Sequence, residues 1–263
     1  MIWTAVARSD MGTNHQEQGL PCQDYGNFCL FNDVMVGAVA DGAGSAKHSD
    51  VGAQLAVEGV LGYLGGIEKR LQYSQPLSEQ EARKLFTQTL KEVLASLHQQ
   101  AAKDGYAVSE LACTLLVFIA TPDWLTAMQI GDGFIVVRSP ESVPQLLFQP
   151  DKGEFANETT FITSENALEE MQVQVFPHQQ EFICAATDGL ERVAIRLSDG
   201  TPFSPFFQPL EECLREPTSQ QEKDEYIQNF LASERLNRRT SDDKTLLLCL
   251  NSISCESISC EQI

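Results

Sequence analysis

The sequence has few basic residues. It contains 18 Lys and Arg against 37 Asp and Glu, which gives a formal net charge of −19. A surface this acidic repels nucleic-acid phosphates and anionic lipid headgroups, so we expect neither nucleic acid nor a membrane as a partner. No apolar run approaches the roughly 18 residues of a membrane-spanning helix. With 43% hydrophobic residues, the composition is that of a soluble globular protein.

The sequence also lacks paired cysteine motifs. None of its eight cysteines forms a CxxC pair. The chain starts without a signal-peptide pattern, so we expect a cytoplasmic protein with reduced thiols. Cysteines in or beside apolar runs are interpreted as small core residues, namely Cys22, Cys29, Cys113, Cys184 and Cys249. Cys255 and Cys260 repeat in a tail, ISCES–ISCEQ, which is either a frayed terminus or a redox or metal handle.

Neither a domain-sized repeat nor a low-complexity linker is present. We therefore expect a single domain over residues 1–250, a tail over 251–263, and a monomer. Two helical patterns follow the first strands, and apolar runs separated by turn signals then suggest a meander, so the expected class is α+β. The expected strands are 2–9, 25–31, 34–41, 113–120, 124–130, 134–138, 145–148, 173–176, 182–186 and 244–250; the helices are 49–64, 78–103, 202–217 and 219–233; loops cover 10–23 and 235–243, and a flap covers 151–167.

The segment VGAVADGAGSAKHSD, residues 36–50, contains the first candidate site. A buried strand ends there on Asp41, which is followed by Gly42 and Gly44. A carboxylate beside glycines suits a hard metal ion, because glycine lets a backbone carbonyl approach and join the ligands. A plain turn is the alternative for this Asp-Gly pair on its own.

Recurrence favours the metal site. Other aspartates also lie at the ends of apolar runs, namely Asp24, Asp132, Asp188 and Asp242. Strand ends can gather carboxylates from distant parts of the sequence, and such a cluster needs cations to neutralise it. Oxygen ligands of this kind select Mg²⁺ or Mn²⁺.

The order of the motifs resembles the protein phosphatase 2C family of metal-dependent serine/threonine phosphatases, in particular its bacterial branch. The motifs are QD at 23–24, VADGAGS at 39–45, CTLLVFIA at 113–120, IGDG at 130–133, ATDGL at 186–190 and SDDKTLLL at 241–248. The resemblance spans nearly the whole chain. It implies a four-layer α-β-β-α sandwich, in which two antiparallel sheets are flanked by helix pairs and a two-metal centre lies at one end.

The resemblance also implies roles for these residues. Asp41 would bridge two Mg²⁺ or Mn²⁺ ions, and the Gly42 carbonyl would bind the second. Asp188 and Asp242 would complete the first metal's ligands, and Asp24 would serve the second, directly or through water. Asp132 matches an acidic residue that helps to hold a third, looser metal. Asp41, Asp188 and Asp242 would thereby hold the nucleophilic water shared by two ions ~4 Å apart.

Four positions depart from the family pattern. His15 stands where many members have an Arg that grips the substrate phosphate; a His can donate a hydrogen bond to phosphate, and a surface loop histidine is the alternative. Gln23 stands where many relatives have Glu, and Ala43 replaces the His of some eukaryotic members. Asp243 falls where the family more often has Asn, so Asp242 is taken as the ligand.

These features lead to three hypotheses. The first is hydrolysis of phosphoserine and phosphothreonine on a phosphoprotein, with a serine/threonine kinase as a possible counterpart. The second, motivated by His15, Gln23 and Ala43, is a pseudophosphatase that binds phosphoproteins or regulates them. The third is a metal-dependent hydrolase of small phosphorylated molecules. The sequence carries no readable code for the physiological substrate.

Overall fold

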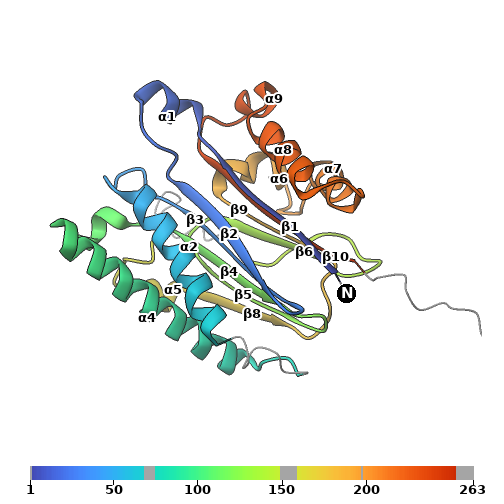
Figure 1. The fold of residues 1–263 in the computed structure, drawn as a ribbon, viewed down its shortest axis with the longest axis horizontal. Coiled ribbons are helices and arrows are strands. Elements are labelled where there is room, and N and C mark those ends of the chain that lie inside the picture. Colours follow the sequence, from blue (N-terminus) through green and yellow to red (C-terminus); the bar gives the residue numbers. More distant parts are fainter. Residues whose placement is uncertain (1, 68–74, 149–158, 197, 253–263) are drawn as a thin grey trace, which may run out of the picture.

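The chain folds into two five-stranded antiparallel sheets that face each other. The computed structural model describes residues 2–67, 75–148, 159–196 and 198–252 (Figure 1). Sheet A has the order β1 (Ile2–Asp10), β10 (Lys244–Ser252), β9 (Phe182–Ala186), β6 (Phe134–Arg138) and β7 (Gln145–Leu146). Sheet B has the order β2 (Asp24–Phe31), β3 (Val34–Asp41), β4 (Leu115–Ala120), β5 (Leu125–Ile130) and β8 (Gln172–Phe176).

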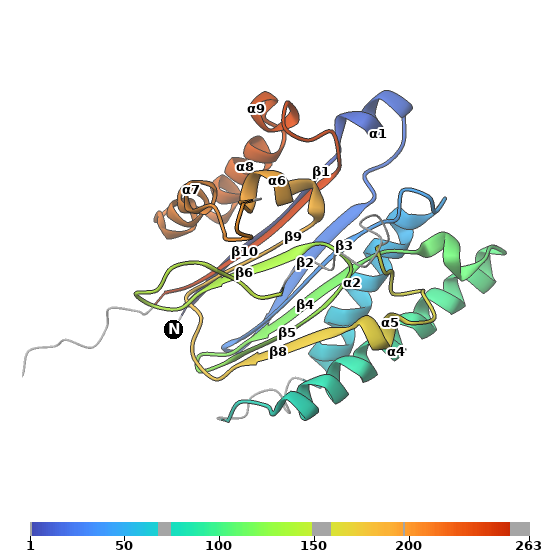
Figure 2. The same cartoon turned by 180° about the vertical axis from the view of Figure 1, so that it is seen from behind.

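Helices cover the outer face of each sheet. The long helices α2 (Ser49–Gly66) and α4 (Glu79–Asp104) lie on sheet B, and α7 (Ser204–Arg215) and α8 (Gln220–Leu231) lie on sheet A (Figures 1 and 2). Short elements complete the described part: α1 (Thr13–Gln18), η1 (Val108–Leu111), α5 (Ala167–Glu170), η2 (Asp188–Leu190), α6 (Glu191–Ala194) and α9 (Glu234–Asn237). The predicted α-β-β-α sandwich is confirmed. Within the described ranges, no helix has the length and apolar character needed to cross a membrane.

The sequence of strand β3 is almost continuously apolar because both faces of the strand are buried. Val36, Ala38 and Ala40 face α2 and α4, whereas Met35 and Val39 face the core between the sheets. A strand covered on both faces cannot alternate apolar and polar residues. Its position at the centre of the molecule gives the residue at its end, Asp41, a rigid support.

Two helices of the described chain begin with a capping box. The Ser78 side chain accepts a hydrogen bond from the Glu81 backbone N–H, and the Glu81 carboxylate accepts one from the Ser78 backbone N–H. Ser219 and Glu222 form the same capping box before α8. The start of α2 is different, because His48 takes the N-cap position without a side-chain hydrogen bond.

The predicted meander is wrong after β5. Strand β6 does not pair with β5 but joins sheet A beside β9, so the chain crosses between the sheets at residues 131–133. Gly131 adopts a φ of +101°, which side chains rarely tolerate, and this allows the sharp change of direction. The crossing places Asp132 at the junction of the two sheets.

Smaller differences concern the loops. The predicted loops 10–23 and 235–243 contain the short helices α1 and α9, which are too short to produce a periodic hydrophobic pattern. Strand β10 continues to Ser252, so the first two residues of the predicted tail belong to sheet A. Residues 253–263, with both tail cysteines, and 151–158 of the predicted flap lie outside the described residues.

Gly37 on β3 tests the packing between the sheets. A Cβ at this position would overlap the Phe118 ring and lie 2.6 Å from a Leu247 methyl group. We expect Gly37→Ala to lower the free energy of unfolding by about 1–3 kcal/mol through overpacking. In urea titrations, the double variant with Phe118→Leu should lose less than the sum of the two single losses. Strict additivity would contradict this packing.

Candidate metal centre

The predicted aspartates meet at one end of the sandwich. Asp24, the first residue of β2, pairs with Asp41, the last residue of β3. Asp188 lies two residues beyond the end of β9, and Asp242 two residues before the start of β10, which is the antiparallel partner of β9. Strand register therefore brings together residues that are far apart in the sequence.

A cavity of about 220 Å³ is formed between these strand ends. Its lining includes Asp41, Gly42, Asp132, Asp188 and Asp242, and His15 also reaches it; further lining residues are Gln23, Ala43, Gly44, Thr114, Thr159, Phe161 and Asp243. Asp24 is the one predicted site residue outside this lining. It is 5% exposed, and the Thr187 hydroxyl donates to its carboxylate at 2.6 Å.

The carboxylates repel one another strongly. Burial and then the charges of Asp243 and Asp188 raise the pKa of Asp24 to about 8, although the Thr187 hydrogen bond acts in the opposite direction. Burial, followed by the charge of Asp132, raises the pKa of Asp188 to about 6. The pKa of Asp41 lies well above its ordinary value because of burial and then the charges of Asp24 and Asp188. The folded chain thus brings several carboxylates together, and the raised pKa values show that their ionised forms are not fully stabilised by neighbouring groups.

The donor set suits a hard divalent cation in its chemistry. Clustered carboxylate oxygens are the ligands that Mg²⁺ and Mn²⁺ prefer, and a cation relieves the repulsion that raises these pKa values. A Cβ on Gly42 would lie 2.7 Å from the Gln23 carbonyl oxygen, so glycine is required there. In their present rotamers, no three His, Cys, Asp or Glu side chains of the described chain form a group that could hold a metal ion.

Asp243 and Asp242 have different surroundings. The Asp243 carboxylate is 3% exposed and accepts hydrogen bonds from the backbone N–H of Gly12 at 2.7 Å and of Gln23 at 2.6 Å. His15 Nδ1 lies 2.9 Å from the same carboxylate and must be its donor, because an ionised carboxylate only accepts. Asp242 is exposed at the cavity. Two departures from the family pattern, His15 and Asp243, are therefore in direct contact.

Sequence reasoning missed three threonines that hold the aspartates. Thr187 binds Asp24, the Thr159 hydroxyl donates to Asp132 at 2.6 Å, and the Thr114 hydroxyl accepts from the Asp41 backbone N–H at 3.0 Å. Thr114 and Thr187 lie inside the CTLL and ATDGL motifs, which is a signal that could have identified them. Thr159 carries no such signal.

The described cysteines are free, and those of the core are poor nucleophiles. Burial raises the pKa of the Cys113 and Cys184 thiols, and the nearby Asp41 charge adds to the effect at Cys113. The reactive form of cysteine is the thiolate, so these side chains stay inert at neutral pH. Their role is packing, as the sequence indicated.

Comparison with known proteins identifies the family. The family described as Protein phosphatase 2C matches residues 11–232. The chain is also 36% identical over 257 residues to Serine/threonine-protein phosphatase 3 of Escherichia coli K12, covering 95% of this chain and 99% of that protein. The chain belongs to the protein phosphatase 2C family. The resemblance predicted from the motifs is therefore confirmed.

Solved structures of protein phosphatase 2C type share the fold. A serine/threonine phosphatase of S. agalactiae superposes with a TM-score of 0.64 at 15% identity, covering 95% of this chain and all of that one. Stp1 of Staphylococcus aureus gives 0.60 at 11% identity, covering 96% of each chain. RsbX, solved in complex with magnesium, gives 0.56 at 13% identity, covering 95% of this chain and 96% of that one. At these identities the likeness concerns the fold alone.

The raised pKa values predict how stability depends on pH. The folded-state pKa values of Asp188, about 6, and Asp24, about 8, exceed the ordinary value of 3.8, so the folded state binds more protons than the unfolded state. In EDTA, the free energy of unfolding should therefore fall as the pH rises from about 4 to about 8. Urea titrations across this range measure the slope.

Saturating Mg²⁺ should remove most of that loss, because the cation compensates the ionised carboxylates. The variant Asp24→Asn should lose the part of the slope between about pH 6 and pH 8. Stability that rises with pH in EDTA would contradict the described electrostatics.

Proposed function

We propose that the protein hydrolyses phosphoserine and phosphothreonine in phosphoproteins with the help of two Mg²⁺ or Mn²⁺ ions. One observation carries this proposal: carboxylates from separate strand ends surround one cavity in a chain of the protein phosphatase 2C family. The name of the E. coli relative, a serine/threonine-protein phosphatase, supports the substrate class. The magnesium complex of RsbX supports the type of cofactor.

The proposed ligands are the residues that the motifs indicated. Asp41 would bind both ions, and Asp188 and Asp242 would complete the ligands of the first. The Gly42 carbonyl would bind the second ion, which Asp24 would also serve, directly or through water. Asp132, held by Thr159, would contribute to a third, weaker site. Bound there, such ions supply an activated water and neutralise phosphoryl charge. No cysteine nucleophile is needed.

His15 is proposed to contact the substrate phosphate. It reaches the cavity, and the buried Asp243 carboxylate fixes its ring by accepting from Nδ1 at 2.9 Å. The same contact leaves Nε2 as the ring nitrogen that Asp243 does not use and that can donate to phosphate. Asp243 is a positioning residue in this proposal, because it also binds the backbone of Gly12 and Gln23.

The proposal is tested by phosphatase activity titrated with Mn²⁺ on p-nitrophenyl phosphate and on a phosphothreonine peptide. We expect metal-dependent activity in the wild type and a loss of about a hundredfold or more in Asp41→Ala, since a metal site contributes several kcal/mol. The matched control is Asp33→Ala, an exposed aspartate in the turn at the other end of the β2–β3 hairpin. This control should keep full activity.

Other outcomes separate the remaining hypotheses. A folded, metal-binding protein without turnover would indicate the pseudophosphatase. Phosphopeptide turnover far slower than that of phosphorylated metabolites would indicate a small-molecule hydrolase. Equal activity in Asp41→Ala and wild type would show that the site is elsewhere.

The role of His15 gives a separate prediction. A hydrogen bond to a charged group contributes about 1.5–3 kcal/mol, so His15→Ala should lower kcat/KM by about tenfold or more, chiefly through a higher KM. Asp243→Asn should lower it less, and the double variant should equal His15→Ala, because Asp243 acts through the His15 ring. Fully additive losses would show that the two residues act independently.

A further inference from the structure

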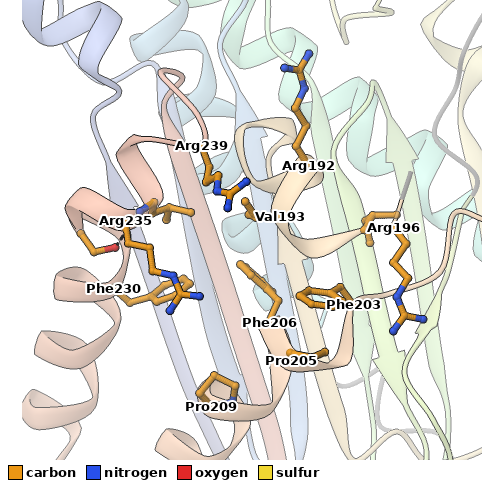
Figure 3. A pocket seen from close by; sticks show the side chains of 13 residues that line it. Arg192, Val193, Arg196, Phe203, Pro205, Phe206, Pro209, Phe230, Arg235 and Arg239 are labelled. Carbon is orange, nitrogen blue, oxygen red and sulfur yellow. Dashed lines mark hydrogen bonds between the residues drawn. The ribbon is translucent and has the colours of Figure 1, made fainter. Parts of the chain in front are cut away.

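A second and larger cavity lies on the outer side of sheet A, away from the metal centre. It has a volume of about 840 Å³ and is bordered by residues of α6, α7, α8 and α9 (Figure 3). Volumes of this size belong to sites that bury a ligand or a peptide side-chain cluster. Nothing in the proposed reaction uses this cavity.

The cavity is lined mainly by apolar groups. Aromatic and proline side chains from α7, the segment before it and α8 point into it, together with Val193 of α6 (Figure 3). They are Val193, Phe203, Pro205, Phe206, Pro209 and Phe230. Phe203 is 39% exposed, although most large apolar side chains of the described chain are buried. An apolar surface that stays open in this way typically marks a binding site.

Four arginines surround this apolar floor: Arg192, Arg196, Arg235 and Arg239. The chain has only 18 basic residues against 37 acidic ones, so this concentration of positive charge is exceptional for the molecule. All four are exposed. Four arginines of this acidic chain therefore border a single cavity.

None of the four guanidinium groups forms an ion pair with a described carboxylate, whereas Arg8, Arg138, Arg215 and Arg238 all do. Glu234, next to Arg235 in the sequence, is paired with Arg238 at 2.6 Å. The Arg196 guanidinium instead lies over the Phe203 ring, 5.5 Å from its centroid. Arg196 also interacts electrostatically with the exposed Asp199 carboxylate. The positive charge of Arg192, Arg235 and Arg239 has no such ion-pair partner within the described ranges and can bind an anionic partner.

The arrangement of the guanidinium groups indicates an extended partner. Figure 3 shows the guanidinium groups of the four arginines at separate points; that of Arg192 points away from the phenylalanine and proline side chains, and the four tips do not converge on one point. A single phosphate or carboxylate would be bound by converging donors. Several separated anionic groups, with apolar side chains between them, match this arrangement better.

The cavity is linked to the metal centre through the backbone. Arg192 on α6 follows Asp188 by four residues, and Arg239 precedes Asp242 by three. A polypeptide bound along the arginines would thus be held next to the two segments that carry these aspartates.

We propose that this cavity is a docking site for an acidic segment, rich in bulky apolar side chains, of a partner protein. The apolar side chains of the partner contact the phenylalanine and proline floor, and its carboxylates pair with the four arginines. This site is independent of the proposed catalysis, so its test does not require turnover.

The probe is a fluorescein-labelled peptide of about twelve residues in which Glu alternates with Leu and Phe, measured by fluorescence anisotropy on the full chain. We expect saturable binding that weakens as the salt concentration rises, because exposed charge pairs are screened. Peptides with Lys in place of Glu, or Ser in place of Leu and Phe, should bind at least tenfold more weakly.

Charge reversal on the protein locates the site. The double variants Arg235→Glu with Arg239→Glu, and Arg192→Glu with Arg196→Glu, should each weaken binding at least tenfold. The matched control is Arg83→Glu, an exposed arginine of α4 on the opposite face, which should bind like wild type. Circular dichroism and hydrolysis of p-nitrophenyl phosphate check that each variant is folded.

Three results would overturn the proposal. The first is absence of peptide binding by the wild type, and the second is equal weakening by Arg83→Glu. The third is self-association of the wild type in light scattering that both double variants abolish, which would assign the cavity to a second copy of the chain. Absence of phosphatase activity in the wild type would contradict the proposed function, but it would leave the docking result intact.

Discussion

The repulsion between carboxylates at one end of the sandwich is the constraint on which the rest of the structure depends. Asp24 and Asp41 are opposite each other in adjacent strands; Asp24 is buried and Asp41 half-buried, and both have raised pKa values. Such a pair is unfavourable in a protein that lacks a bound cation. It persists because the strands that carry it are fixed by three apolar cores, one between the sheets and one under each helix layer.

Backbone segments at this end of the sandwich also lie in close contact, so the aspartates cannot move apart easily. A side chain on Gly189 would overlap the Asp243 carbonyl, and one on Gly133 would lie 2.8 Å from the Ala186 carbonyl oxygen. The turns after β5 and β9 and before β10 are therefore packed directly against one another. The backbone therefore fixes where the aspartates lie, and a cation that neutralised their charge would stabilise the folded chain.

Much of the architecture was predictable because local patterns agreed with the final fold. The strands 34–41, 134–138 and 182–186 have the predicted bounds, and both capping boxes formed where Ser78 and Ser219 indicated them. The family followed from the order of the motifs. The exchange of sheets after β5 was not predictable, because a turn between two apolar strands has the same local pattern whether the strands pair or separate.

The site was predictable in its acidic residues and not in their supports. Strand-end aspartates are visible in the sequence, but the contact between His15 and Asp243 joins residues 228 positions apart. The arginine-lined cavity was invisible for the same reason, since its four arginines come from two short helices and their flanks. Each of these features depends on contacts between distant parts of the sequence, and such contacts leave no periodic pattern in the sequence.

The most direct test of the metal centre is a crystal structure with Mn²⁺, using anomalous scattering at the manganese edge. The account predicts two strong peaks among Asp24, Asp41, Asp188 and Asp242, with rotated carboxylates and an intact Asp243–His15 contact. Absence of anomalous density at saturating Mn²⁺, or peaks only elsewhere on the acidic surface, would contradict it.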